Sequence, residues 1–334
     1  MTKDKIKLAV VGLGNMGRYM IRTISNPGLA EQVELVAICE ANAAAREQYQ
    51  KDYPHVQYYT DYSKMIEEVD IDLLYVSVPP AYHYDIVCAA LRKKIHVFCE
   101  KPLANNLQEA AELLKLAEEA NVVHAIHFSM PYEPSVKRME RMIKEQAIGT
   151  IRSMELILHF PTWPRSWQHN SWISTRAQGG FVLEVGVHWI NVIQKLFGTI
   201  THVQSELELP ADEERCETGI RAKMLLNSEV PIYVNGLSGM AGAERVSLVV
   251  YGSKGTIALE NWSELHVGAI GQPLEKVAVE EIEQTPIVAQ VIRAIHGEHA
   301  DYFDFRDGYE AQVVLEALRH PASPQLADIR KAAE

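Results

Sequence analysis

The sequence predicts an α/β protein with two domains: a doubly wound parallel sheet, then an α+β domain with an antiparallel sheet. In the first third of the chain, short apolar runs alternate with helical patterns, as in parallel strands connected by helices. The alternation stops near Ser129. Beyond Gly198, extended segments follow one another with short turns, which indicates an antiparallel sheet. We therefore place the domains at residues 1–128 and 129–334.

The individual elements follow from the periodicity of apolar residues. In the first domain we expect strands at 6–11, 33–39, 56–58, 71–78, 96–99 and 122–128, with helices at 18–24, 43–53, 61–67, 86–91 and 106–120. In the second domain we expect strands at 150–160, 201–209, 217–226, 231–237, 245–251 and 257–259, with helices at 135–146, 179–191, 285–295 and 307–318.

A glycine pattern directly follows the first predicted strand. The order strand, Gly12-Leu13-Gly14-Asn15-Met16-Gly17, helix is that of a dinucleotide-binding turn. Gly12 permits the tight turn, Gly14 lets the backbone approach a pyrophosphate, and Gly17 lets the helix pack close to the strand. The free N–H groups of the helix N-terminus then face the phosphates. The alternative is a glycine-rich loop in another kind of α/β protein.

The second predicted strand ends in Glu40, whose carboxylate can accept hydrogen bonds from a ribose diol. The same carboxylate would repel a ribose 2′-phosphate, and Ala41 and Asn42 provide no adjacent arginine. NAD is therefore the expected cofactor. NADP is the less favoured alternative because Arg46 lies only a few residues further on.

Composition excludes some classes of partner. The 334 residues include 32 Lys plus Arg against 44 Asp plus Glu, a formal net charge of -12. This argues against nucleic acid or an anionic membrane as the main partner. The sequence shows no signal peptide and no apolar run of membrane-spanning length. Four cysteines without C-x-x-C spacing are typical of reduced thiols in a cytoplasmic protein.

In a doubly wound sheet, ligands bind beyond the carboxyl ends of the strands. This rule groups the glycine turn and Glu40 with Pro79-Pro80 and with Glu100-Lys101-Pro102. Lys101 would lie where a nicotinamide is expected, and a partly desolvated ammonium there could hydrogen-bond a substrate hydroxyl. The alternative is a solvated lysine in a surface turn.

With Pro79-Pro80 and His83 upstream, the stretch AALRKKIHVFCEKPLA at residues 89–104 resembles the Gfo/Idh/MocA oxidoreductases. The resemblance implies an N-terminal Rossmann domain and a C-terminal domain with an open, mostly antiparallel sheet. It also implies NAD- or NADP-dependent oxidation of a secondary alcohol of a sugar, inositol or related polyol, or the reverse reduction. The open sheet often forms the subunit interface in that family, so a homodimer or homotetramer is expected.

Two segments of the second domain carry candidate substrate contacts. Residues 161–172 are rich in tryptophan, and such rings pack against the C–H surface of sugars or fill interfaces between domains or subunits. In residues 179–191, a helix would place Glu184 and His188 on one face, as a general base with its orienting carboxylate or as a structural pair. The family pattern has Asp where this chain has Glu184 and Asn191.

By this resemblance we assign His188 as general base, Lys101 as the group that orients the substrate hydroxyl and stabilises its charge, and Glu184 as the group that tunes His188. The expected cofactor contacts are Gly12, Gly14, Asn15, Met16, Gly17, Glu40, Pro79, Pro80, His83, Glu100 and Lys101. The expected substrate contacts are Lys101, Trp163, Arg165, Trp167, Trp172, Glu184, His188 and Asn191.

The sequence thus predicts a cytoplasmic NAD-dependent dehydrogenase. Two alternatives stay open: a glycoside hydrolase of the same fold that retains NAD, and a dinucleotide- or sugar-sensing protein without turnover. No metal is expected, because hydride transfer needs none and the pairs His124/His127 and His296/His299 lack a convincing set of further ligands.

Overall fold

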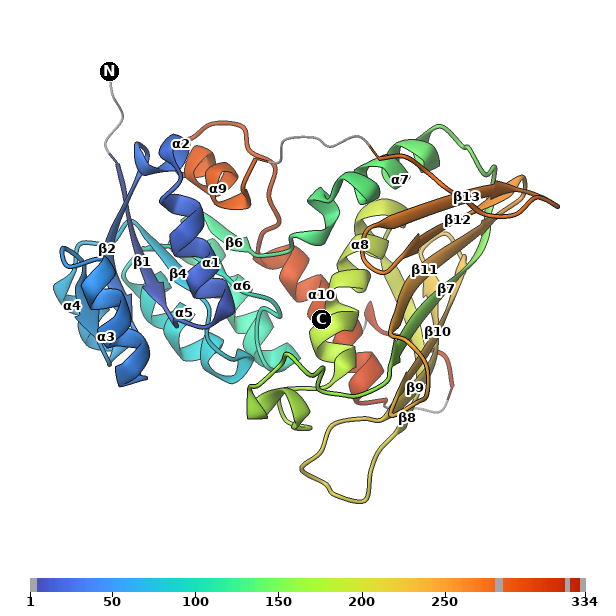
Figure 1. The fold of residues 1–334 in the computed structure, drawn as a ribbon, viewed down its shortest axis with the longest axis horizontal. Helices are drawn as coiled ribbons and strands as arrows, with labels where there is room; N and C mark the ends of the chain where they lie inside the picture. Colours follow the sequence, from blue (N-terminus) through green and yellow to red (C-terminus); the bar gives the residue numbers. More distant parts are fainter. Residues whose placement is uncertain (1–4, 280–284, 322–324, 331–334) are drawn as a thin grey trace. The chain divides into compact units, whose positions relative to one another are not determined.

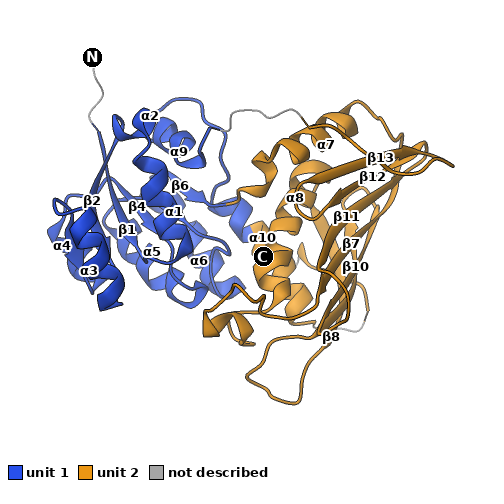
Figure 2. Cartoon of the chain, in the orientation of Figure 1, with its two compact units in different colours: residues 1–127, 285–309 blue, residues 128–284, 310–334 orange. Residues whose placement is uncertain are grey.

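The computed structural model describes residues 5–279, 285–321 and 325–330. It divides into two compact units, coloured separately in Figure 2. Unit 1 comprises Met1–His127 and Thr285–Tyr309, and unit 2 comprises Phe128–Gln284 and Glu310–Glu334. The sequence-based boundary assigned everything after residue 128 to the second domain. The structure groups residues 285–309 with unit 1, because there the chain returns to the first sheet: the Ile126 amide donates to the Phe303 carbonyl, 2.9 Å away.

Unit 1 is built on a six-stranded parallel sheet in the order β3-β2-β1-β4-β5-β6 (Figure 1). This is the strand order of a doubly wound dinucleotide-binding domain. The strands are β1 (Ile6–Val11), β2 (Val33–Cys39), β3 (Gln57–Tyr59), β4 (Leu73–Val76), β5 (His96–Cys99) and β6 (His124–Ile126). All four residues of β4 are fully buried, as expected of a central strand with both faces covered.

Helices connect these strands, and several start where the sequence supplies a capping side chain. Asn42, Asp61 and Asn106 each accept a hydrogen bond from a backbone N–H in the first turn of the helix that follows. The helices are α1 (Asn15–Ile24), α2 (Pro27–Ala30), α3 (Ala43–Asp52), α4 (Tyr62–Glu68), α5 (His83–Arg92), α6 (Leu107–Ala120) and α9 (Ile287–Ile295), with a 3₁₀ turn at Pro80–Tyr82.

Unit 2 is built on a nine-stranded sheet in the order β14-β13-β12-β11-β7-β10-β9-β8-β15. Only the pair β7 and β10 is parallel among these described strands, so the prediction of a mostly antiparallel sheet is confirmed. The strands are β7 (Ile151–Phe160), β8 (Ile200–Glu208), β9 (Gly219–Leu226), β10 (Pro231–Ser238), β11 (Arg245–Gly252), β12 (Gly255–Glu260), β13 (Glu264–Ala269), β14 (Glu275–Lys276) and β15 (Ala327–Asp328).

One face of this sheet forms the core of unit 2. Along β7 and β10, buried residues alternate with partly exposed ones, which is the pattern of a sheet with one covered face. The helices of this part of the chain are α7 (Pro134–Lys144), α8 (Val187–Phe197) and α10 (Phe305–Arg319), and the unit boundary falls within α10. Short 3₁₀ turns lie at Met130–Tyr132 and Ser171–Ser174, and one turn of π-helix at Val182–Gly186 leads into α8.

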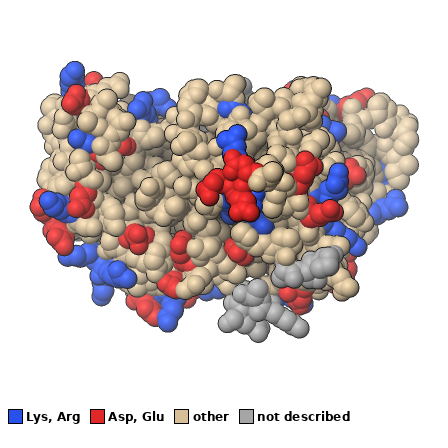
Figure 3. Space-filling model, turned by 90° about the horizontal axis from the view of Figure 1, so that it is seen from below, with Lys and Arg blue, Asp and Glu red and all other residues tan. Residues whose placement is uncertain are grey.

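The surface agrees with the acidic composition. On the face drawn in Figure 3, acidic and basic side chains are interspersed among uncharged ones, and the described residues form no extended basic area there. Among the described helices, none is both long enough and apolar enough to span a bilayer.

Candidate functional site

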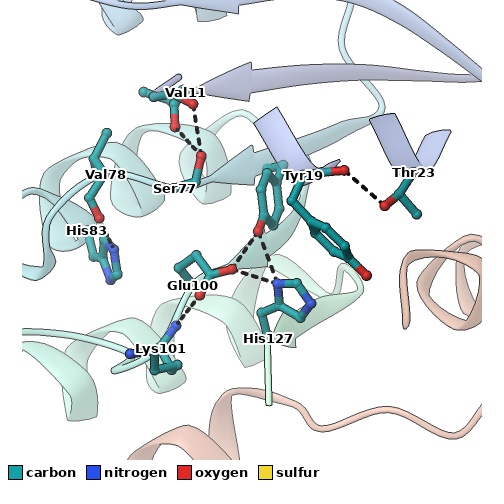
Figure 4. A network of polar contacts seen from close by, with 11 residues as sticks. Val11, Tyr19, Thr23, Ser77, Val78, His83, Glu100, Lys101 and His127 are labelled. Carbon is teal, nitrogen blue, oxygen red and sulfur yellow. Dashed lines mark hydrogen bonds and ion pairs between the residues drawn. The ribbon is translucent and has the colours of Figure 1, made fainter. Parts of the chain in front are cut away.

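The glycine turn of unit 1 is closed tightly against the end of β4. Gly12 has φ +94°, and a Cβ there would lie 2.5 Å from the Ser77 carbonyl oxygen. A Cβ on Gly17 would lie 2.0 Å from the Gly12 carbonyl oxygen, so only glycine lets α1 start this close to the strand. The Ser77 hydroxyl donates to the Val11 and Gly12 carbonyls, and Figure 4 shows Ser77 beside Val11.

The N-terminus of α1 has the features of an anion site. Its N-cap is Gly14, which has no side chain to occupy the first N–H groups, and Asn15 and Met16 in the first turn are exposed. Such a terminus presents backbone donors and the positive end of the helix dipole to a phosphate.

Glu40 lies beside this turn and is held by two backbone groups. Its Oε2 accepts from the Leu13 N–H at 2.6 Å, and its Oε1 accepts from the Asn42 N–H at 2.7 Å. Each carboxylate oxygen can accept a further bond, so the pair stays able to receive ribose hydroxyls. Arg46 donates to the carbonyls of Glu40 at 2.7 Å and Ala41 at 3.1 Å, so it is bound to the backbone at the end of β2.

His83 joins two loops at the carboxyl edge of the sheet. It is fully buried, with Nδ1 2.9 Å from the Pro102 carbonyl oxygen and Nε2 2.9 Å from the Val78 carbonyl oxygen. Burial lowers the pKa of the His83 imidazole, although the hydrogen bonds to these carbonyls act in the opposite direction. We assigned His83 to cofactor binding. In the structure it is buried between the loops after β4 and β5, so it can act on a cofactor only through these loops.

Glu100 is also turned inward, into a buried polar network (Figure 4). Its Oε1 accepts from the Tyr75 hydroxyl at 2.5 Å and from His127 Nδ1 at 2.6 Å. Burial alone raises the pKa of Glu100, but the charge of His127 and the bonds from His127 and Tyr75 outweigh it and hold that pKa at about 2. Glu100 is thus an ionised anchor. We assigned it to cofactor binding, whereas His127 entered the sequence analysis only as a poor metal ligand.

Lys101 follows this anchor directly. Its backbone N–H lies 3.3 Å from Glu100 Oε2, and its peptide bond to Pro102 is cis. The Lys101 side chain is partly exposed, whereas Pro102, Leu103 and Ala104 are buried. The loop therefore presents one ammonium group from an otherwise buried stretch.

In unit 2, the segment with Glu184 and His188 differs from the expected continuous α-helix. Residues Val182–Gly186 form a π-helical turn, and His188 lies in the first turn of α8. Glu184 and His188 are partly exposed, whereas every other residue from 181 to 190 is buried. These two residues are therefore the accessible ones of this segment. Single π turns within helices occur often at functional sites.

Glu217, which precedes β9, holds the start of this segment. Its Oε1 accepts from the Val182 N–H at 2.8 Å, and its side chain is buried. Gly180 has φ +95°, and a Cβ there would lie 2.3 Å from Glu217 Oε2; a Cβ on Gly179 would lie 2.3 Å from the Ile173 carbonyl oxygen. The double glycine thus lets the chain pass between Glu217 and the tryptophan-rich segment. The sequence contained no signal for Glu217.

Arg165 is fixed within the protein. Its Nε and one Nη atom each lie 2.8 Å from a carboxylate oxygen of Glu244, in a bidentate ion pair, and only 11% of its side chain is exposed. Its guanidinium also lies 4.8–5.8 Å from the centroids of four aromatic rings, those of Phe160, Trp163, Trp167 and Trp262. We assigned Arg165 to substrate binding, but these groups already occupy it.

The remaining expected substrate contacts differ in accessibility. The Trp163 indole donates to the Ile173 carbonyl at 3.3 Å and packs on Phe160 and Phe181, so it belongs to the core of its loop. Trp167 is 59% exposed and Trp172 is half-buried. Asn191 is buried, and its Oδ1 has no hydrogen-bond partner in the described part of the chain.

Trp262 is a further aromatic residue that the sequence analysis did not single out. Its ring lies edge-on to the His188 imidazole, with centroids 5.8 Å apart and an interplanar angle of 81°. No group of three or more His, Cys, Asp or Glu suited to a metal occurs among the residues that the structure describes.

The sequence of each unit matches a model of a known protein family. Residues 6–128 match a model described as an oxidoreductase family with an NAD-binding Rossmann fold, and residues 136–258 match the GFO/IDH/MocA C-terminal domain. The chain belongs to the Gfo/Idh/MocA oxidoreductase family. Unit 1 is therefore its NAD-binding Rossmann domain, as the glycine turn and Glu40 predicted.

Curated relatives in this family are distant. An uncharacterised oxidoreductase of Schizosaccharomyces pombe is 30% identical over 61% of this chain, and the match spans 55% of that relative, about half its length. Myo-inositol 2-dehydrogenase of Thermotoga maritima is 22% identical over 78% of this chain and 77% of its own.

Solved structures share the whole fold. One from Desulfitobacterium hafniense, titled as a candidate NADPH-dependent oxidoreductase, has a TM-score of 0.86 at 18% identity, covering 99% of this chain and 100% of its own. Levoglucosan dehydrogenase in complex with NADH has a TM-score of 0.82 at 19% identity, covering 98% of this chain and 99% of its own. At these identities the likeness establishes the fold.

Proposed function

We propose that this protein is an NAD-dependent dehydrogenase that oxidises a secondary alcohol of a sugar, inositol or related polyol, or reduces the corresponding ketone. One observation carries the proposal. Glu184 and His188 are the two accessible residues of an otherwise buried segment, in a chain whose other unit is an NAD-binding domain. An accessible imidazole beside a carboxylate is the usual general base near neutral pH.

The proposed roles follow from the chemistry of alcohol oxidation. Bound NAD supplies the acceptor for the hydride that leaves the carbinol carbon. His188 accepts the hydroxyl proton, so the carbon–oxygen single bond becomes a carbonyl as the C–H bond breaks. The Lys101 ammonium donates a hydrogen bond to the reacting oxygen and stabilises its negative charge. Glu184 favours the protonated form of His188 after the transfer.

The preference for NAD is supported by the end of β2. Glu40 faces the glycine turn through its bond to Leu13, and Arg46, the nearest cation considered for a 2′-phosphate, is engaged by two carbonyls. A ribose diol can donate to Glu40, whereas a phosphate there would be repelled. The substrate class is supported by relatives named for myo-inositol and levoglucosan.

The test is NADH formation, followed by absorbance, with NAD or NADP and a panel of inositols, aldoses, anhydrosugars and sugar acids. We expect turnover with one group of compounds, and a loss of about 10²- to 10⁴-fold in kcat for His188→Ala and for Lys101→Ala with nearly unchanged NAD affinity. Lys93→Ala, an exposed lysine at the end of α5, is the matched control and should stay active.

Several outcomes would contradict the proposal. A fully active Lys101→Ala variant would make that lysine structural. Binding of NAD without turnover of any compound would favour the sensing protein. Release of free sugar from a glycoside, with tightly held NAD and no net NADH, would favour the hydrolase.

We also propose that copies of the chain associate through the open face of the unit 2 sheet. On β10, Tyr233 is 47% and Leu237 is 36% exposed on the face opposite the core. A cytoplasmic location is part of the same proposal, and the four cysteines are free and buried, as expected in a reducing compartment.

A further inference from the structure

The turn between β12 and β13 has a backbone conformation that suits glycine at a position occupied by tryptophan. The Ser263 N–H donates to the Glu260 carbonyl at 3.2 Å, and the two central residues have φ +49° at Asn261 and +76° at Trp262. Two consecutive positive φ values define the turn type that favours Asn-Gly in hairpins. A bulky residue with positive φ is strained, and such strain persists where the surroundings require it.

The surroundings of Trp262 are other side chains of unit 2. Its half-buried ring contacts His188 edge-on at 5.8 Å, and it packs on Trp189 with centroids 5.8 Å apart. The Arg165 guanidinium lies 5.7 Å from the Trp262 ring centroid. The indole therefore lies against both the first turn of α8 and a cation.

That cation is itself immobilised. Arg165 makes its bidentate pair with Glu244, from the connection between β10 and β11, and contacts three further rings. Because the Arg165 guanidinium is held by these contacts, the Trp262 ring packs against an immobile group on one side. The imidazole of His188, on α8, lies against the same ring.

We propose that Trp262 is a positioning residue for His188. The strained turn holds the indole against the imidazole and restricts rotation of the His188 ring, so the base is aligned before substrate arrives. Alignment matters because a misplacement of about 1 Å can cost about 100-fold in rate. This proposal rests on the role given to His188 in the proposed function, and it assigns Trp262 no contact with substrate.

The first experiment reads the His188 ring directly and needs no turnover. Histidine Cε1–H resonances are recorded by NMR, and His188 is assigned by its loss in His188→Ala. Trp262→Gly should move this resonance by several tenths of a ppm, because the ring current of the indole is removed, and should alter its titration with pH. Trp262→Phe should preserve part of the shift. Asn261→Gly, in the same turn with Trp262 intact, is the matched control and should leave the resonance in place.

Substituting Trp262 by glycine distinguishes a loss of His188 positioning from a loss of folding. Glycine accepts the positive φ of this turn without strain, so Trp262→Gly should retain the backbone better than Trp262→Ala. The second experiment measures kinetics: kcat should fall about 10- to 100-fold in Trp262→Gly, with the KM for NAD within about two-fold of wild type. Phenylalanine should restore part of the lost kcat.

An unmoved His188 resonance in Trp262→Gly would overturn the proposal, as would an equal displacement in Asn261→Gly. A displaced resonance with wild-type kcat would also overturn it. Failure of the proposed function looks different: His188→Ala would keep its turnover, whatever the NMR spectra of the Trp262 variants show.

Discussion

At the scale of single residues, the cofactor preference depends on which groups remain able to accept or donate. Glu40 Oε1 and Oε2 each receive one backbone N–H and can receive one more donor, whereas Arg46 is bound to two carbonyls. The Glu40 carboxylate can therefore still accept hydrogen bonds from a ribose diol. The Nη1 group of Arg46 is already used by two carbonyls and is not offered to a 2′-phosphate.

This predicts that Glu40→Ala weakens NAD binding by about 10- to 100-fold, the cost of losing hydrogen bonds to a charged acceptor. NADP should be affected much less, because the substitution also removes a repulsive charge. Calorimetric titration of wild type and variant with both cofactors measures the loss of affinity for NAD and for NADP. Glu47→Ala, an exposed acid on α3, is the control and should change neither affinity. Equal losses for NAD and NADP would contradict the ribose assignment.

The buried Glu100 predicts a dependence of stability on pH. Its pKa of about 2 lies below the ordinary value of 4.5, because the charge and hydrogen bonds of His127 and Tyr75 outweigh burial. Below about pH 4.5 the unfolded chain binds a proton that folded Glu100 does not, so the stabilisation is lost as the pH falls toward 2. The stabilisation from ionised Glu100 is present above about pH 4.5.

Urea unfolding of Glu100→Gln measures this contribution. At pH 7 the variant should be less stable by about 3 kcal/mol, as when one partner of a buried ion pair is removed. The difference from wild type should narrow as the pH falls from 4.5 toward 2. Glu47→Gln, which removes an exposed carboxylate on α3, should show no comparable narrowing. A difference independent of pH would mean that Glu100 is not ionised in the folded protein.

Residue types and spacing singled out the glycine turn and Glu40 as candidates, and the family resemblance added proposed roles for Lys101 and His188. They did not reveal which side chains are already engaged. We predicted that Arg165 contacts substrate, yet its guanidinium is paired with the carboxylate of Glu244, 79 residues further along the chain. Glu100 likewise faces His127, 27 residues away. Such partners come from tertiary packing, which no local pattern encodes.

At the scale of elements, the turn before the π-helical segment makes its own prediction. Gly180→Ala adds a Cβ at φ +95° and within 2.3 Å of Glu217 Oε2, on the carboxylate whose Oε1 accepts from the Val182 N–H. It should destabilise the protein by about 2 kcal/mol or more, through backbone strain and displacement of Glu217. It should also lower kcat, since the displaced segment carries Glu184.

Denaturant midpoints and kinetics check this prediction against a matched glycine. Gly28 lies in α2, and a Cβ there would have nothing within 4 Å. Gly28→Ala should therefore be neutral or slightly stabilising. A Gly180→Ala variant as stable as Gly28→Ala would show that Glu217 can move aside without cost.

Most strands and helices were predicted within a few residues, because their apolar periodicity is strong. The exceptions have physical reasons. β13 follows a turn with Asn-Trp where the hairpin signal is Asn-Gly, so its start was not recognised. β14 and β15 have two residues each and exist through pairing with neighbours. The π turn is only five residues long, too short to show an apolar period of its own, so sequence alone did not distinguish it from α-helix.

At the scale of the whole molecule, the fold class was predicted but the path of the chain was not. Alternating strands and helices, then successive strands, determine the two kinds of sheet. The return of residues 285–309 to unit 1 depends on long-range contacts such as that of the Phe305 N–H with His124 Nδ1, 181 residues apart. Substrate identity is equally beyond the sequence, because no motif specifies the shape of a polyol site.

Association through the sheet makes the last prediction. Tyr233 and Leu237 project from the open face of β10, whereas Ile232 and Val234 between and beside them point into the core. In the association proposed above, another copy of the chain covers these exposed apolar side chains. Wild type should therefore show a molar mass that is a multiple of its 37.6 kDa chain mass, measured by light scattering after size exclusion.

The double variant Tyr233→Arg with Leu237→Arg should lower this molar mass toward that of the single chain, because two unpaired charges would be buried in the interface. Gln108→Arg, on the exposed face of α6, adds charge elsewhere and should leave the mass unchanged. An unchanged mass in the double variant would place the interface, if wild type has one, on another surface.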